Sequence, residues 1–220
     1  MNKYIKMQKN FYRTGTSNHL EHNDNEDYWN ILLKDLKDSS IWSGKTALDF
    51  GSGMGRNVTN MLGLCNWNRV DGVDISENNI NRCKAEYVDQ SSKWFCNNGI
   101  DLSDLDSDEY DFIMSTVVLQ HIPVHEIRTV LLKEMYRVLK KNGVLSVQMG
   151  FGPKEGAKAL YFDNMYHAQG TNSMFDVRVT DANDVIKDFK NIGFININCE
   201  IKPSFSDNQH PQWIFIRAEK

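Results

Sequence analysis

The chain has 220 residues, of which 40% are hydrophobic and 25% are charged. This composition is typical of an ordinary globular domain and excludes the disordered and fibrous classes. The formal net charge of −4 at pH 7 provides no overall basic field, so we do not expect nucleic acid as a partner.

No run approaches the roughly 18 apolar residues of a membrane-spanning helix, and the first residues lack the apolar stretch of a signal peptide. We therefore expect a cytoplasmic protein with no membrane partner. The four cysteines lie far apart, without the spacing of a metal site, so no bound metal is expected.

The predicted elements begin with one helix, at 25–37, which follows a polar stretch. Seven runs rich in β-branched and aromatic residues then predict strands. These strands are expected at 45–50, 69–75, 93–97, 110–116, 144–149, 194–200 and 212–218.

Helices are predicted between the first five strands. Ser76 is a natural N-cap for a helix over 77–89, because its hydroxyl can accept a free backbone N–H. A later helix is expected to start at Pro123, to carry apolar residues at helical spacing, and to end with 140–142 before Gly143. This alternation predicts right-handed crossovers and a parallel sheet with helices on both faces.

The end of the chain departs from this alternation. A helix is predicted at 181–191, and the last two strands are joined by 202–211, which is too short for a crossover helix. We therefore predict an α/β domain over 45–220, with five parallel strands and an antiparallel edge pair. Residues 1–44 are predicted to form an N-terminal helical flap, and about 150–176 an insert on the substrate side.

A glycine loop follows the first predicted strand. It completes the pattern D-x-G-x-G-x-G at Asp49, Gly51, Gly53 and Gly55. Glycine allows the backbone to turn sharply and to approach a ligand closely, and the helix that follows presents free N–H groups to an anion. The dinucleotide fingerprint G-x-G-x-x-G fails, because Arg56 occupies its third glycine position.

This pattern resembles the class I S-adenosyl-L-methionine-dependent methyltransferases of the small-molecule type, over roughly residues 45–150. The resemblance implies a Rossmann-like seven-stranded sheet and S-adenosyl-L-methionine as cofactor, released as S-adenosyl-L-homocysteine. It also implies that Asp74 accepts hydrogen bonds from the ribose, and that Asp101 reads the adenine amino group while the neighbouring backbone N–H meets a ring nitrogen. Ser115 and Thr116 are implied to lie near the cofactor's ammonium group. The implied cofactor-binding residues are Asp49, Phe50, Gly51, Ser52, Gly53, Gly55, Arg56, Asp74, Ile75, Asp101, Leu102, Ser115 and Thr116.

His121 is the candidate catalytic residue. Methyl transfer in this family is an in-line displacement, and an oxygen or nitrogen acceptor can need a base to remove its proton. His121 follows the fourth predicted strand, where the resemblance puts the methyl group. Alternatively, its ring packs against the pocket or hydrogen-bonds a neighbouring carbonyl.

Candidate substrate residues come from the flap and the insert. In the flap, Tyr12 and Tyr28 are hypothesised to cover the methionine end of the cofactor. In the insert, Tyr161, Tyr166 and His167 could line the acceptor pocket, or could instead form a small core beneath a lid.

The acceptor is predicted to be a small molecule methylated on oxygen or nitrogen, such as a sugar or another biosynthetic intermediate. The chain lacks the Asp/Asn-Pro-Pro-aromatic element of amino-methylating nucleic-acid enzymes and the Pro-Cys pair of cytosine C5 chemistry. Its fourth strand does not end in an acid, which argues against the magnesium-dependent catechol type. The open alternatives are a protein or tRNA methyltransferase, a non-catalytic cofactor-binding protein and, more remotely, a dinucleotide-dependent oxidoreductase. Monomer and homodimer are both compatible with the sequence.

Overall fold

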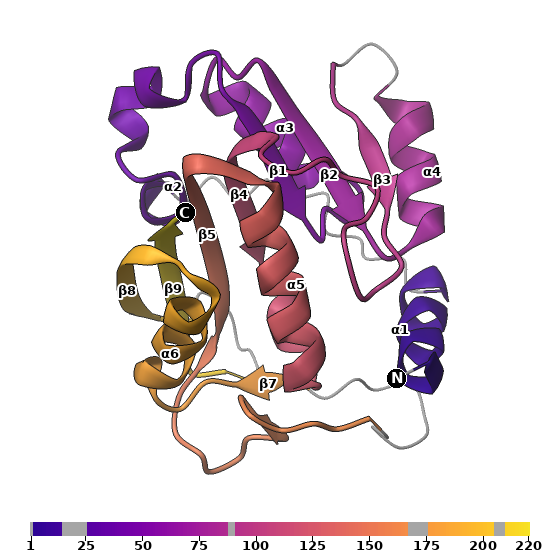
Figure 1. Cartoon of the computed structure of the whole chain (residues 1–220), viewed down its shortest axis with the longest axis vertical. Coiled ribbons are helices and arrows are strands. Elements are labelled where there is room, and N and C mark those ends of the chain that lie inside the picture. Colours follow the sequence, from indigo (N-terminus) through magenta and orange to yellow (C-terminus); the bar gives the residue numbers. More distant parts are fainter. Residues whose placement is uncertain (1, 15–25, 88–90, 167–175, 205–209) are drawn as a thin grey trace.

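The computed structural model describes residues 2–14, 26–87, 91–166, 176–204 and 210–220. Its centre is a seven-stranded sheet in the order β3-β2-β1-β4-β5-β9-β8 (Figure 1). The strands of this sheet are β1 (Thr46–Phe50), β2 (Arg69–Asp74), β3 (Trp94–Cys96), β4 (Tyr110–Thr116), β5 (Leu139–Phe151), β8 (Ile195–Pro203) and β9 (Gln212–Glu219). The helices are α1 (Asn2–Thr14), α2 (Glu26–Leu33), α3 (Arg56–Leu64), α4 (Glu77–Glu86), α5 (His125–Val138) and α6 (Ala182–Ile192), with 3₁₀ turns η1 (Leu36–Trp42) and η2 (Leu119–His121).

The strand directions confirm the predicted topology. Strands β1 to β5 pair in parallel, whereas β9 is antiparallel to both β5 and β8. A further pair, β6 (Ala159–Leu160) and β7 (Val177–Arg178), forms a small parallel sheet beside the end of β5, where Phe151 bridges to Val179. Within the described part of the chain, no helix has the length and apolarity needed to cross a membrane.

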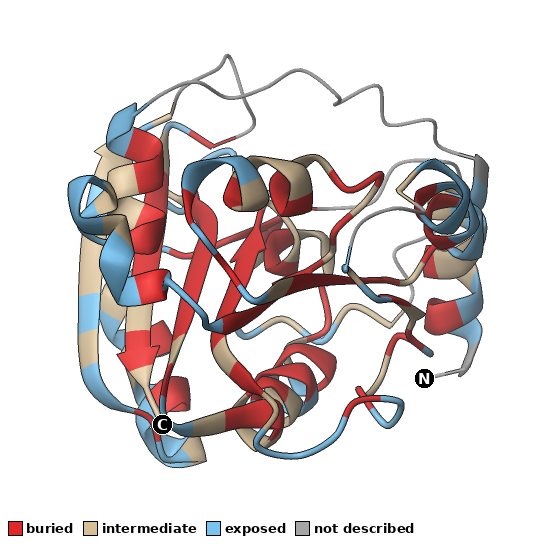
Figure 2. Cartoon of the chain, turned by 90° about the horizontal axis from the view of Figure 1, so that it is seen from above, coloured by how far each residue is buried: buried red, intermediate tan, exposed pale blue. Residues whose placement is uncertain are grey.

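Helices cover both faces of the sheet because successive strand residues point to opposite sides. Leu48 of β1 packs in a core shared with α5 and α6, and the preceding Ala47 packs in a second core shared with α2 and α3. Figure 2 shows the central strands buried between partly exposed helices.

The prediction for the N-terminal region was wrong in two respects. A helix, α1, precedes the predicted one, because Tyr4 and Ile5 bury an apolar face in the main core. The predicted helix over 25–37 ends early, at Leu33, because Lys34 and Asp35 adopt left-handed backbone angles that a helix cannot continue through.

The predicted end of the helix before β5 was also wrong. The helix ends at Val138, and Leu139 already pairs with Tyr110 of β4. Leu139 is fully buried, so sheet pairing takes precedence over the basic last turn expected from 140–142.

Candidate functional site

The glycine loop lies at the point where the strand order reverses, between β2 and β4 on either side of β1. In open α/β sheets, ligands bind in the crevice outside the carboxyl ends of the strands at such a point. Gly51 donates its N–H to Val73 O at 2.8 Å, and a Cβ at Gly51 would come within 2.2 Å of the Val118 side chain. The loops after β1 and β4 therefore meet at Gly51.

The other two glycines of the loop have different neighbours. At Gly55 a Cβ would come within 2.8 Å of Tyr87 and Trp94, so this glycine allows close packing. At Gly53, where φ is +54°, a Cβ would point into open space. Gly53 therefore presents bare backbone to a space that a ligand can occupy.

Asp74, at the end of β2, shapes this loop. Its Oδ2 accepts the N–H of Gly53 at 2.9 Å, and its Oδ1 accepts the N–H of Ser76 at 2.7 Å. Burial raises the pKa of Asp74, and the two backbone hydrogen bonds oppose that shift. The side chain of Asn79 and the backbone of Ile75 also interact with this carboxylate.

Asp49 is a buried acid with no partner. It is fully buried, and neither carboxylate oxygen accepts a hydrogen bond from any described residue. Burial raises the pKa of Asp49 to about 7, while the charge of Arg56 and the amide of Asn57 act in the opposite direction. The hydroxyl of Ser115 is likewise buried without a partner among the described residues. Buried polar groups normally have partners, so this end of the site fits a polar or cationic ligand group.

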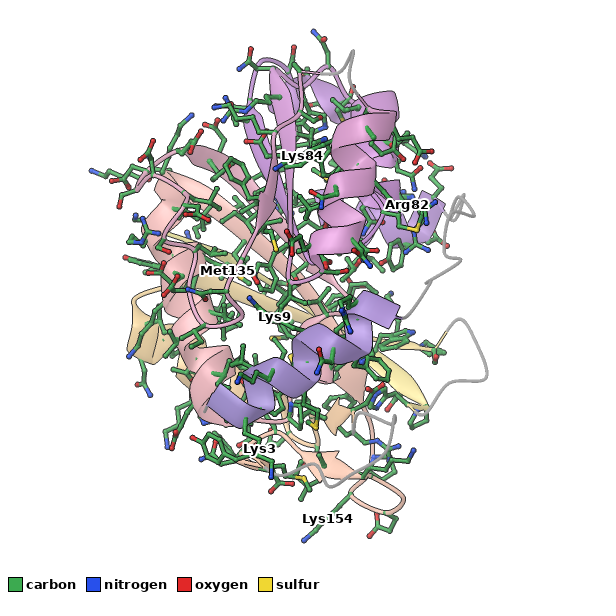
Figure 3. The ribbon with its side chains drawn as sticks, turned by 90° about the vertical axis from the view of Figure 1, so that its right-hand side faces the viewer. Lys3, Lys9, Arg82, Lys84, Met135 and Lys154 are labelled. Atoms are coloured by element: carbon green, nitrogen blue, oxygen red, sulfur yellow. The ribbon has the colours of Figure 1, made fainter. Side chains whose placement is uncertain are left out.

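A cavity of about 270 Å³ lies beyond β2, between α1 and the loop that follows β3. Its lining includes Lys9, Phe95, Asn97, Asp101 and Leu102. Figure 3 shows α1 crossing this face beside α4, with Lys9 labelled.

The two groups predicted to bind the adenine, the Asp101 carboxylate and the backbone N–H next to it, already have hydrogen-bond partners within the protein. A hydrogen bond with Ser103 and one with Asn98 hold the pKa of Asp101 below its usual range, and burial opposes them. The N–H of Leu102 donates to Glu134 at 3.0 Å. The backbone hydrogen bond that the resemblance implied next to Asp101 is therefore already taken at Leu102.

Helix α1 joins the ends of two strands above the glycine loop. Gln8 Nε2 donates to the carbonyl of His121 at 2.9 Å, and the Ser76 hydroxyl donates to the carbonyl of Tyr12 at 3.2 Å. The Tyr12 ring lies 6.4 Å from that of His121. Burial, followed by the charge of Asp176, raises the pKa of Tyr12, so its hydroxyl stays protonated.

Helix α2 brings Tyr28 to the other end of the loop. Its hydroxyl donates to Gln148 Oε1 at 3.3 Å, and it interacts with Thr116, which also accepts from Asn57 at 3.1 Å. Burial raises the pKa of Tyr28 to about 12, while Thr116 and Arg56 lower it.

His121 lies at the end of η2, after a strained step in the backbone. Val117 has φ +57°, a conformation that costs a β-branched residue on the order of 1–3 kcal/mol and is concentrated at functional sites. The Nδ1 atom of His121 lies 2.7 Å from Asp176 Oδ1. Asp176 was missed by the sequence analysis: it belongs to no motif, and 55 positions separate it from His121.

The insert tyrosines contact other residues. The Tyr161 hydroxyl donates to Asp188 at 2.9 Å, and that of Tyr166 donates to Glu126. These contacts are with α5 and α6, as in the alternative of a small core beneath a lid. His167 lies outside the described residues. Of the remaining predicted residues, Phe50 is the last residue of β1, and Ser52 and Ile75 lie in the loops after β1 and β2.

Residues 48–147 match the protein family described as a methyltransferase domain. These residues therefore form a methyltransferase domain of the class I S-adenosyl-L-methionine-dependent type, with that molecule as its cofactor. A search of curated proteins finds no match.

Solved structures share the fold at low sequence identity. A methyltransferase from Methanosarcina mazei has 17% identity and a TM-score of 0.63, covering 81% of this chain and 93% of its own. One from Mesorhizobium loti has 16% identity and a TM-score of 0.60, covering 81% and 92%. Phosphoethanolamine N-methyltransferase 2 of Haemonchus contortus, in complex with phosphomonomethylethanolamine and S-adenosylhomocysteine, has 16% identity and a TM-score of 0.63. That match covers 98% of this chain and 57% of the other.

Proposed function

We propose that this methyltransferase acts on an oxygen or nitrogen atom of a small-molecule acceptor, with His121 as the general base. The observation that carries the proposal is the position of α1, which is bonded to both Ser76 and the His121 carbonyl above the glycine loop. A helix across this opening favours a small acceptor over a protein or tRNA, which would need an open docking cleft. The absence of an acid at the end of β4 and the net charge of −4 also favour a small acceptor.

The chain's own residues fit the cofactor in three parts. The carboxylate of Asp49, which has no hydrogen-bond partner among the described residues, suits the ammonium group, and the carboxylate of Asp74 beside Gly53 suits the ribose hydroxyls. The cavity beside Asp101 suits the adenine ring. Under this proposal, residues 1–44 act as a flap in which Tyr12 and Tyr28 contact the methionine end.

When bound, S-adenosyl-L-methionine supplies a methyl group already activated by its sulfonium. His121 Nε2 takes the proton that the acceptor loses as its lone pair forms the bond to the methyl carbon. The bound cofactor would supply the leaving group, since its sulfur would keep the electron pair of the carbon–sulfur bond. Proton removal of this kind contributes about 10²–10⁴-fold to a rate. Tyr12 is held protonated, so it can donate a hydrogen bond to the acceptor but cannot act as the base.

One neighbour supports a small acceptor that contains nitrogen. The Haemonchus contortus enzyme was solved with phosphomonomethylethanolamine, a small amine. At 16% identity this supports the size of the acceptor and does not identify it.

The first test is thermal unfolding with S-adenosyl-L-methionine, S-adenosyl-L-homocysteine and NAD in parallel. A ligand at about 100 times its Kd adds roughly 2.7 kcal/mol to stability, which raises Tm by about 5–10 °C in a domain of this size. We expect both sulfur compounds, and not NAD, to produce this shift. Formation of S-adenosyl-L-homocysteine is then measured with panels of small alcohols and amines, with tRNA and with proteins. Turnover with either macromolecule alone would refute the small-molecule proposal.

A further inference from the structure

The carboxylate of Asp176 lies between two histidines from different segments. Its Oδ1 is 2.7 Å from Nδ1 of His121, which follows β4, and its Oδ2 is 3.6 Å from Nε2 of His210, which precedes β9. Gln120 also donates to Oδ2, at 3.4 Å. Asp176 and His210 are both buried, with 8% and 2% of their surface exposed. One carboxylate therefore connects three segments at the carboxyl edge of the sheet.

The protonation states in this cluster follow from its contacts. Burial by itself would raise the pKa of Asp176, but its contacts with His121 and His210 outweigh burial and hold that pKa well below its usual range. An ionised carboxylate only accepts hydrogen bonds, so the Nδ1 of His121 carries the proton. The lone pair of His121 is then on Nε2, as proton removal from an acceptor requires.

His210 is fixed by a similar argument. Arg178 Nε donates to its Nδ1 at 3.5 Å, and because arginine has no acceptor, that nitrogen must be unprotonated. The proton of His210 is therefore on Nε2, which faces Asp176. Arg178 is itself held by the carbonyls of Pro153 and Glu155, each at 2.9 Å. Gly150 leaves room for this ring, since a Cβ there would come within 2.3 Å of it.

We infer that Asp176 is the positioning residue of His121: it selects the Nδ1–H form of the ring, while His210 faces the other carboxylate oxygen. This inference rests on the proposed role of His121 as the base. Among the described residues, the groups that face His121 are the Tyr12 ring from α1, Gln8 at the backbone carbonyl, and Asp176. Asp176 is the one acid among them.

The chain contains a matched control. His125 Nε2 lies 2.6 Å from Asp188 Oδ2, and Asp188 also accepts from Tyr161. This pair uses the opposite ring nitrogen, so His125 should carry its proton on Nε2. Asp176→Asn and Asp188→Asn are therefore equivalent changes at the two acids.

The test is nitrogen NMR of the full chain labelled at histidine, at pH 8, with assignments from His121→Gln and His125→Gln. We expect His121 in the Nδ1–H form and His125 and His210 in the Nε2–H form. Asp176→Asn should lower the Nδ1–H fraction of His121, since a neutral amide accepts more weakly and can donate to Nδ1. Asp188→Asn should leave His121 unchanged. An Nε2–H form of His121 in the unmodified protein, or equal effects of the two variants on His121, would overturn the inference.

A second readout separates this inference from the proposed function. With an acceptor found in the panel, Asp176→Asn should lower kcat about tenfold or more and leave the Kd of S-adenosyl-L-methionine within about twofold, a part of the 10²–10⁴ that a base supplies. If His121→Gln keeps full kcat, the proposed base is wrong, whereas the NMR result still decides whether Asp176 positions the ring.

Discussion

His121 and His125 are four residues apart, and each lies within 2.7 Å of an aspartate, yet the two pairs have different surroundings. His121 lies between α1 and Asp176 at the carboxyl edge of the sheet, with its side chain 28% exposed. His125 begins α5 and is flanked by the rings of Tyr161 and Phe162.

The difference shows how one chemical pair can serve two purposes. Asp176 bonds Nδ1, the nitrogen nearer the main chain, and leaves the outer Nε2 to the site. Asp188 bonds Nε2 and takes a second hydrogen bond from Tyr161, whose ring lies under the Arg128 guanidinium. Under the proposed function the first pair serves proton transfer, whereas the second joins α5, α6 and the insert.

Replacing each histidine by glutamine gives the largest expected contrast. His121→Gln should lower kcat about 10²–10⁴-fold, because glutamine cannot take the acceptor's proton. His125→Gln should leave kcat within about threefold and act on stability. The measurement is S-adenosyl-L-homocysteine formation at saturating cofactor from pH 5 to 9. Equal losses of kcat would remove the functional distinction between the two pairs.

Asp49 differs from Asp176 and Asp188, because it is a buried acid that bonds no histidine among the described residues. Because burial raises its pKa to about 7, the native protein keeps a proton that the unfolded chain has lost between about pH 4 and 7. Stability should therefore fall as pH rises across this window. Asp49→Asn should remove that loss and stabilise the ligand-free protein by about 2–4 kcal/mol at pH 8, with little effect at pH 4.

The same change should weaken binding of S-adenosyl-L-methionine about tenfold or more, because the amide cannot pair with an ammonium group. Thermal unfolding at pH 4 and 8, together with titration calorimetry, checks both effects. Weaker binding without a pH-dependent gain in stability would mean that Asp49 is ionised and solvated in the free protein.

Removing Asp188 tests the structural pair. Asp188→Ala leaves the bonded atoms of His125 and Tyr161 without their acceptor, at a cost of about 2 kcal/mol. Tm should fall by roughly 4–8 °C. The affinity for S-adenosyl-L-methionine, measured by calorimetry, should stay the same. A loss of affinity instead of stability would place this pair in the cofactor site.

Much of the fold was predictable because each signal is local. The D-x-G-x-G-x-G loop and the β-rich runs gave all seven strands and the antiparallel edge pair. The predicted ends of helices and strands were wrong where a contact with a residue distant in the sequence sets the boundary. Leu139 is an example, because it pairs with Tyr110. Helix α1 was missed because its stability comes from Tyr4 and Ile5 in a core built by the rest of the chain.

The candidate site likewise contains residues that local sequence patterns mark and residues that only long-range contacts bring there. Asp49 is the second-last residue of β1 and Asp74 is the last residue of β2, so their place at the carboxyl edge could be predicted from the sequence. Asp176 and His210 reach His121 only through the return of the chain along β7 and β9, and no local pattern marks them. Tyr161 was a candidate for the acceptor pocket, with a small core beneath a lid as the alternative, and its bond to Asp188 could not be predicted from the sequence.

The smallest expected contrast is between the tyrosines beside the two histidines. Tyr161→Phe removes one buried hydrogen bond to Asp188, which should cost about 1 kcal/mol and lower Tm by roughly 2–4 °C without changing kcat/KM. Tyr12→Phe should keep Tm within about 1 °C. It should lower kcat/KM for the acceptor severalfold, because the protonated hydroxyl beside His121 is then lost. If Tyr12→Phe changed Tm and left kcat/KM unchanged, Tyr12 would have the same packing role as Tyr161. The surroundings of His121 and His125 would then not differ in the role of the neighbouring tyrosine.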